Sequence, residues 1–249
     1  MAEVISFAPG SYRYIKGVFQ YSAGVAAEPG YRLERVRFAT PVPLSEGFRR
    51  IEEIIKSAGR PLSSFAACEL RSPAPFTEEG FVAFNKVYVG TLTEWGLFAG
   101  ENNPVARSNV CPEVNPPAEP SFYAFSYTVE DANAVPSFVV AGSGEAPEGL
   151  GSYAENTIAR GDVSPSGLRQ KAQWVLGEME RRMKALGFGW GQTTGVQLYT
   201  VHDIHPFVAD EIAKRGAMRA GLTWHFNRPP VHELEYEMDC RGVSVERTL

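Results

Sequence analysis

One stretch of the sequence, residues 103–117, combines a lone arginine with small neighbours and a proline pair. Arg107 lies within Pro-Val-Ala-Arg-Ser, and alternating apolar and polar residues lead from it to Pro116 and Pro117. Such a pattern is typical of a strand that enters a turn. A guanidinium can hold a carboxylate through two parallel hydrogen bonds, so Arg107 is a candidate anion-binding residue. A solvated arginine at a strand end would leave the same pattern.

Thiol and metal chemistry find less support. Cys111 has no histidine in its half of the chain to act as a base, which favours a thiol that packs rather than reacts. His202 and His205 have metal-like spacing, but no third and fourth ligand stand at recognisable spacing, so we expect no metal. The cysteines are odd in number and form no CxxC pair, which suits a reducing compartment: Cys68, Cys111 and Cys240.

Composition narrows the class of protein. The chain has 249 residues, of which 44% are hydrophobic and 21% charged, enough apolar material for one large or two modest cores. The formal net charge is −5, and no cluster of lysine and arginine is visible, so nucleic acid is not an expected partner. No apolar run approaches the ~18 residues of a membrane span, so we expect a cytoplasmic protein without a membrane partner.

The elements that must position Arg107 can be predicted from periodicity. A helix should follow Pro43, with Ser45 as its N-cap, apolar residues at helical spacing and Gly59 as its left-handed end. Thr77 should cap a second helix. The other expected elements of this half are strands at 17–26, 31–38, 65–70 and 122–129, with a polar connector at 130–136.

The second half repeats this order. A long amphipathic helix is predicted at 166–186, and Ile51, Ile55 and Gly59 each have a counterpart 128 residues later, at Met179, Met183 and Gly187. We therefore predict a tandem α+β fold with domains at 1–130 and 136–249. Each would be a mixed, antiparallel-leaning sheet covered on one face by two helices.

Several of these segments resemble the Rid family of enamine/imine deaminases, also called YjgF-like. The resemblance is carried by the 54–59 helix end, the Cys68 strand, residues 81–88 and above all the Arg107 motif with Pro116 nine residues later. It implies chorismate-mutase-like domains and a homotrimer of tandem chains, a pseudo-hexamer of domains with ligand clefts between neighbours.

The resemblance also implies roles for individual residues. Arg107 would hold the substrate carboxylate, with Ser108 beside it. Glycines at the end of the second strand would offer backbone groups, Asn85 would line the cleft and an aromatic residue near the N-terminus would close it. These glycines are Gly24 and Gly142 or Gly144, and the aromatic residue is Tyr12 or Tyr14.

The departures from the family pattern concern the acid. Where simple deaminases carry a cysteine, this chain has Asn109, and the first half has Tyr123 where they place a glutamate. The second half keeps acids at Glu235 and Glu237 but reproduces the arginine motif poorly around Arg219. We therefore predict that Arg107 and Glu235 cooperate across an interface, with Tyr123 or Glu113 as further acid candidates. Arg219 or Arg228 would be the second cation.

Within the family, the chain most resembles 2-aminomuconate-type deaminases of aromatic catabolism. The resemblance implies hydrolysis of a dicarboxylic enamine, with or without chlorine, to release ammonia without a metal or organic cofactor. The arginine would anchor one carboxylate while an acid protonates the enamine carbon and a positioned water adds. Two alternatives stay open: a chorismatase-like hydrolase, and a metabolite-binding module without catalytic activity.

Overall fold

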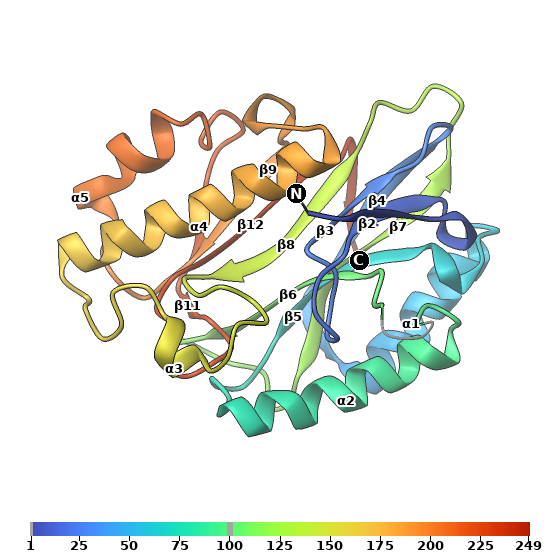
Figure 1. The fold of residues 1–249 in the computed structure, drawn as a ribbon. Helices are drawn as coiled ribbons and strands as arrows, with labels where there is room; N and C mark the ends of the chain where they lie inside the picture. Colours follow the sequence, from blue (N-terminus) through green and yellow to red (C-terminus); the bar gives the residue numbers. More distant parts are fainter. Residues whose placement is uncertain (1, 99–101) are drawn as a thin grey trace.

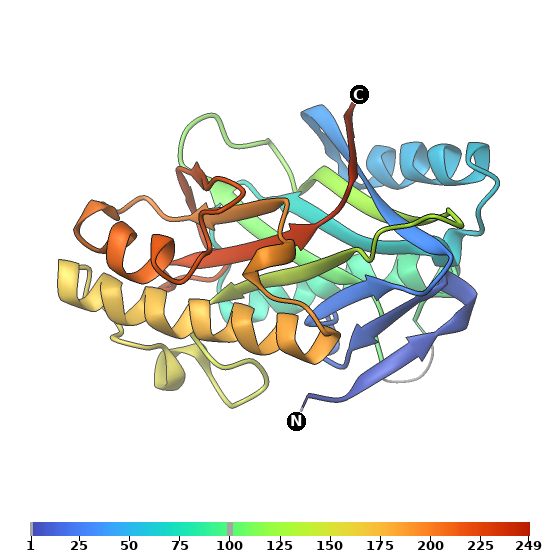
Figure 2. The same ribbon diagram turned by 90° about the horizontal axis from the view of Figure 1, so that it is seen from above.

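The computed structural model of the chain describes residues 2–98 and 102–249. Two sheets face each other in the middle of the molecule, and helices cover their outer faces (Figures 1 and 2). Helix α4 (Pro165–Leu186) packs on one sheet, and α1 (Leu44–Ser57) and α2 (Glu78–Glu94) cover the other. The predicted α+β class is confirmed, and the functional residues must be sought where the two sheets meet.

Seven strands of the described chain form the first sheet, in the order β1-β2-β3-β8-β12-β9-β10. Most neighbours are antiparallel, and β9 and β10 are parallel. The apolar residues on one face of β8 and β12 meet the buried stripe of α4. The bounds are β1 Val4–Phe7, β2 Tyr12–Ile15, β3 Gly24–Ala27, β8 Phe138–Gly144, β9 Gly195–Tyr199, β10 Thr223–His225 and β12 Glu237–Gly242.

The second sheet has six described strands, in the order β11-β6-β5-β7-β4-β13. Strands β5 and β6 are parallel, and their register sets Arg107 beside Cys68. The predicted strands at 31–38, 65–70 and 122–129 are present and extend beyond these limits. The bounds are β4 Tyr31–Pro43, β5 Phe65–Arg71, β6 Ala106–Pro112, β7 Ser121–Glu130, β11 Asn227–Arg228 and β13 Val245–Thr248.

The two halves of the sequence exchange strands. Strand β3 from the first half pairs with β8 from the second, while β13 pairs in parallel with β4 and β11 pairs with β6. A bridge between Ser22 and Ala106 also joins the two sheets. Residues from both halves therefore share one interior, and the division into domains 1–130 and 136–249 stays a prediction.

Helix α1 follows the predicted apolar spacing but begins two residues earlier than an N-cap at Ser45 would place it. Its buried face carries Phe48, Ile51 and Ile55, and Gly59 adopts φ +70° just after the helix. The predicted N-cap at Ser45 is wrong, because the helix begins at Leu44 and its N-cap, Pro43, makes no side-chain hydrogen bond. Pro43 lacks a hydroxyl, and its fixed φ already suits the entry to a helix.

The other two long helices have side-chain N-caps, and the one at Thr77 was predicted. Thr77 accepts a hydrogen bond from the Gly80 amide at 3.1 Å, and Ser164 accepts one from Gly167 at 3.2 Å. The second helix of the second half is reduced to α5 (His205–Phe207) and the π-helical turn η4 (Val208–Ala213). The remaining helical segments are η1 Ala8–Gly10, η2 Leu62–Ser64, α3 Tyr153–Asn156 and η3 Trp190–Gln192.

Candidate active site

Arg107 is a buried cation without a hydrogen-bonded partner. Its side chain is 2% exposed, and neither Nη1 nor Nη2 has a partner among the described residues. Aromatic rings surround the guanidinium instead, with centroids 4.8 Å away for Tyr88, 5.2 Å for Tyr21 and 5.6 Å for Phe81. Because a buried unpaired charge is strongly unfavourable, this arrangement is suited to receive an anion.

A cavity opens beside Arg107 at the meeting point of the two sheets. Strand β6 contributes Arg107 and Asn109, and β8 contributes Gly142 and Gly144. The second half also supplies acidic and phenolic groups to the lining, namely Glu148, Tyr153 and Glu237. One cavity thus combines an arginine from the first half with acids from the second.

Glu237, the first residue of β12, is the buried acid of this cavity. Glu237 is 4% exposed. A Cβ atom added to Gly142 would lie only 2.2 Å from Glu237 Oε1, so the carboxyl group occupies space that a side chain at residue 142 would need. Burial raises the pKa of Glu237 well above 4.5, and repulsion from Asp239, Glu145 and Glu148 adds to this rise. The protonated form of Glu237 is therefore favoured over the carboxylate, and a protonated carboxyl group can donate a proton.

Glu148 presents a second carboxylate in a different environment. Its Oε1 accepts hydrogen bonds from the Tyr21 hydroxyl at 3.0 Å and from Arg182 Nη2 at 2.9 Å. The arginine is fully buried on α4. The cavity therefore holds one acid whose protonated form is favoured, Glu237, and one ion-paired carboxylate, Glu148.

Two other polar residues complete the lining. Burial, followed by the negative charge of Glu148, raises the pKa of Tyr153 to about 12, so this phenol stays neutral. Asn109 accepts a hydrogen bond from Ser72 Oγ at 2.9 Å, which directs its amide nitrogen away from that contact. This nitrogen has no partner in the part of the chain that the structure describes and is free to donate.

The structure brings some of the predicted site residues to Arg107. Gly144 lines the same cavity. Asn85 is fully buried on α2, one turn from both Phe81 and Tyr88, whose rings face Arg107. Neither polar atom of its amide has a partner within 2–98 and 102–249. These placements fit the predicted cleft, and the roles stay predictions.

Glu235 lies elsewhere. Its Oε2 is 2.7 Å from His202 Nε2 and 3.7 Å from Arg228 Nη1, and it does not line the Arg107 cavity. The physical reason is that β12 begins only at Glu237, so residue 235 does not follow the alternation of the strand. The acids of the second half that line the Arg107 cavity are Glu148 and Glu237.

The other acid and cation candidates also lie outside the cavity. The Tyr123 ring is stacked on Arg71, 4.1 Å from its guanidinium, and Glu113 pairs with Arg228 at 2.7 Å. Arg219 is exposed in the turn between η4 and β10. These side chains are engaged with one another or with solvent, and none of them contributes to the lining of the Arg107 cavity.

Three residues that were predicted to bind the substrate do not line the Arg107 cavity and make contacts within the fold. Tyr12 is fully buried and donates its hydroxyl to the Phe65 carbonyl at 3.2 Å. A Cβ on Gly24 would meet Leu186 of α4, so this glycine faces the helix side of its sheet. Ser108 points opposite to Arg107, because neighbours alternate along a strand, and donates to Asp239 Oδ2 at 2.6 Å.

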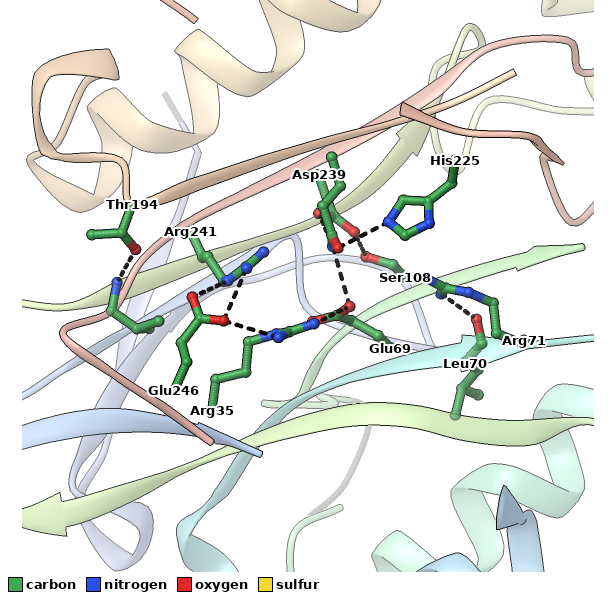
Figure 3. Close-up of polar contacts among 12 residues, drawn as sticks. Arg35, Glu69, Leu70, Arg71, Ser108, Thr194, His225, Asp239, Arg241 and Glu246 are labelled. Carbon is green, nitrogen blue, oxygen red and sulfur yellow. Dashed lines mark hydrogen bonds and ion pairs between the residues drawn. The ribbon is translucent and has the colours of Figure 1, made fainter. Parts of the chain in front are cut away.

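Ser108 belongs to a polar network between the sheets. Arg35 donates to both oxygens of Glu69, at 2.6 and 2.9 Å, and Gln197 donates to Glu69 and Asp239, at 3.1 and 2.9 Å. Figure 3 shows Ser108 beside Asp239, and Arg35 beside Glu69. The network is fully buried and joins the two halves next to the cavity.

Sequence reasoning missed Glu148 and Arg182. Glu148 stands in an irregular loop after β8, where no periodicity points to it. Arg182 did leave a signal, because it interrupts the apolar stripe of α4 between Met179 and Met183. A charged residue on a buried helix face needs a partner, and looking for that partner would have led to the acidic loop.

The cysteines and histidines show other environments. Burial raises the pKa of Cys111 to about 12, so its thiol stays protonated at neutral pH. His205 Nδ1 lies 2.6 Å from Asp203 Oδ1 on the surface. Among the described residues, no three His, Cys, Asp or Glu side chains gather as metal ligands would, and no helix is long and apolar enough to cross a membrane.

Comparison with a curated protein of similar sequence supports the sequence-based resemblance. The chain is 52% identical over 251 residues to 2-amino-5-chloromuconate deaminase of Comamonas testosteroni, covering 100% of both chains. Among solved structures, a proposed endoribonuclease of Thermotoga maritima matches with a TM-score of 0.34 and 18% identity, covering 53% of this chain and 91% of that one. A cyanuric acid hydrolase matches with a TM-score of 0.40 and 10% identity, covering 88% and 69%.

The predicted membership is confirmed along nearly the whole chain. Residues 4–247 match the family described as 2-aminomuconate deaminase CnbZ. This match includes both the Arg107 strand and the strand that carries Glu237. The chain belongs to the 2-aminomuconate deaminase CnbZ family.

Proposed function

We propose that this protein hydrolyses 2-aminomuconate or its 5-chloro derivative and releases ammonia. The observation that carries the proposal is the presence, in one cavity, of the unpartnered guanidinium of Arg107 and the buried carboxyl group of Glu237, whose pKa is raised by burial. A dicarboxylic enamine needs both groups: a cation for a carboxylate and an acid for the enamine carbon. The relative from Comamonas testosteroni bears the name of this activity at 52% identity.

The reaction divides into two proton transfers at one carboxyl group. Glu237 donates its proton to the enamine carbon, which converts the enamine into a cationic imine and leaves a carboxylate. A water molecule then adds to the imine carbon, and the Glu237 carboxylate takes a proton from that water. Collapse of the resulting carbinolamine yields a 2-oxo dicarboxylate and ammonia, with Glu237 returned to its protonated form.

Arg107 supplies position and electrostatics. Two parallel hydrogen bonds from Nη1 and Nη2 would fix the carboxylate next to the amino-bearing carbon and thereby set the distance from the reacting carbon to Glu237. The aromatic rings around the guanidinium keep water from this ion pair and strengthen it. The free amide nitrogen of Asn109 is placed to donate to the substrate from the same strand.

The test is ammonia release by the purified protein. 2-Aminomuconate and 2-amino-5-chloromuconate are each incubated with wild-type protein and with Arg107→Ala, and ammonia is followed by a coupled assay. Buffer alone gives the spontaneous rate, because enamines also hydrolyse in water. We expect release well above this rate only with the wild type. Turnover of chorismate without ammonia release would support the hydrolase alternative, and ligand binding without turnover would support a binding module.

We also propose that the chain assembles as a homotrimer, on the ground of the Rid resemblance. Light scattering on the eluting protein should then give a mass three times that of the 27.3 kDa chain. A monomeric mass at micromolar concentration would contradict this assembly. It would leave the cavity intact, because Arg107 and Glu237 belong to the same chain.

A further inference from the structure

Arg182 is a charged side chain in a place where an apolar one would pack. It is fully buried on α4, between Met179 and Met183 of the stripe that faces the first sheet. Burial of an arginine is unfavourable unless its donors are paired, and an apolar residue of similar volume is often as stable or more so. Nη1 donates to the carbonyls of Ala141 and Gly142, and Nη2 donates to Ser143 Oγ and Glu148 Oε1, at 2.9–3.4 Å.

These contacts fix the position of one carboxylate. Glu148 stands in a loop, yet its Oε1 is held by Arg182 at 2.9 Å and by the Tyr21 hydroxyl at 3.0 Å. The same Tyr21 ring lies 5.2 Å from the Arg107 guanidinium. Glu148 is thus hydrogen-bonded both to α4 and to an aromatic residue beside Arg107, and these bonds give its carboxylate a defined position in the cavity.

The charge at that place is opposite to the charge that Arg107 offers. The cavity therefore presents the guanidinium of Arg107 and the carboxylate of Glu148 to its ligand, and Glu237 lines the same cavity. A substrate that fits must carry a carboxylate and, at some stage of the reaction, a positive charge. The imine formed by carbon protonation is such a cation.

We propose that Glu148 forms the subsite for the nitrogen atom of the substrate, and that Arg182 is the positioning residue that holds Glu148 there. This inference rests on the proposed deaminase function. Glu148 accepts hydrogen bonds from the nitrogen and stabilises its positive charge, and it neither gains nor loses a proton itself. Tyr21 shares the task by donating to the same oxygen while its ring lines the carboxylate subsite.

The inference can be tested by binding alone with two stable ligands that differ only in an amino group. Adipate has two carboxylates, and 2-aminoadipate adds a protonated amine beside one of them. Calorimetry gives Kd for both ligands with wild type, Glu148→Gln and Arg182→Met. We expect each variant to weaken 2-aminoadipate about tenfold or more, which is ~1.4 kcal/mol, and to leave adipate within about threefold. A residue that merely supported the fold would weaken both ligands alike.

Matched variants sharpen the test. Tyr21→Phe keeps the ring but removes one hydrogen bond to Glu148, so we expect a smaller loss confined to 2-aminoadipate. Glu178→Gln removes a carboxylate 3.6 Å from Arg182 that does not line the cavity, and it should change neither Kd. Adipate binding also reports whether Glu148→Gln and Arg182→Met are folded.

The outcomes separate this inference from the proposed function. Equal weakening of adipate and 2-aminoadipate by Glu148→Gln, or no weakening of either, would overturn the nitrogen subsite. Absence of ammonia release by the wild type, or adipate binding that is unaffected by Arg107→Ala, would instead overturn the deaminase proposal. Selective loss of 2-aminoadipate in Glu148→Gln and Tyr21→Phe, with Arg107 required for both ligands, would support the two proposals together.

Discussion

The carboxyl group of Glu237 lies directly over the backbone of Gly142, in space that any side chain at residue 142 would occupy. A Cβ added to Gly142 would stand 2.2 Å from Glu237 Oε1 and 3.2 Å from the Cα of Ser108. The first neighbour is the end of a side chain and can move, whereas the second is backbone. The glycine is therefore required by close approach of strands β8, β12 and β6, and it fixes where the acid of the cavity stands.

Gly142→Ala should displace Glu237 and reduce deaminase activity at least ~100-fold, since a shift of about 1 Å at a reacting group has effects of this size. Gly177→Ala is the matched control, because a Cβ there meets nothing within 4 Å. The control should raise helix stability by ~0.5–1 kcal/mol and leave kcat unchanged. Equal activity of Gly142→Ala and wild type would show that Glu237 does not act from its present position.

Separate substitutions of Glu237 and Glu235 should distinguish the roles of these two acids. Glu237→Gln removes the proton donor, and kcat for 2-aminomuconate should fall ~10²–10⁴-fold. Glu235→Gln changes a carboxylate that pairs with His202 outside the cavity, so kcat should stay within about threefold of wild type. Steady-state ammonia release measures both variants. The reverse ranking would assign the catalytic acid to Glu235, as the sequence alone predicted.

The raised pKa of Glu237 predicts that the deaminase activity is lost at high pH. The donor must be protonated, so kcat should be constant at low pH and fall as the pH rises through this pKa. Arg71 is the positive charge that opposes the rise, so Arg71→Gln should move this loss to still higher pH. Identical pH–kcat profiles for the wild type and Arg71→Gln would contradict the assignment of Glu237 as the proton donor.

The same shift predicts a trade-off between stability and activity. The folded protein holds the Glu237 proton more tightly than the unfolded chain, so stability falls as the pH rises from about 4.5 towards the raised pKa. Glu237→Gln removes that loss. Its Tm should exceed that of wild type at pH 8 by ~2–4 °C for each kcal/mol regained, and the difference should shrink towards pH 4.5. A lower Tm than wild type at pH 8 would argue against a strongly disfavoured carboxylate.

Arginine at residue 107 should matter for its forked shape as well as its charge. Arg107→Ala should weaken adipate binding by ~2–5 kcal/mol, the usual effect of removing one partner of a buried ion pair. Arg107→Lys should recover only part of this, because an ammonium group cannot make two parallel hydrogen bonds. Arg228→Ala is the control, since this arginine pairs with Glu113 at the surface. Calorimetric Kd values for the three variants give the comparison.

The sequence by itself determined the elements that local periodicity encodes. The stripe of α4, the left-handed glycines after α1 and α4, and the Thr77 cap all depend on residues within a few positions of one another. The short motif around Arg107 likewise sufficed to indicate the family and a carboxylate-binding role. In each case the signal lies in a single segment, in which the separation of two residues along the sequence fixes their relative positions in the structure.

Only the tertiary structure decided which acids share a cavity with Arg107. Glu235 and Glu237 have the same parity in the sequence, but β12 begins at the second of them, and the close approach of Gly142 admits its carboxyl group. The pairing of Glu148 with Arg182 joins a loop to a helix 34 residues away. Such contacts depend on how the two halves exchange strands and pack. These are long-range interactions, which local sequence patterns do not predict.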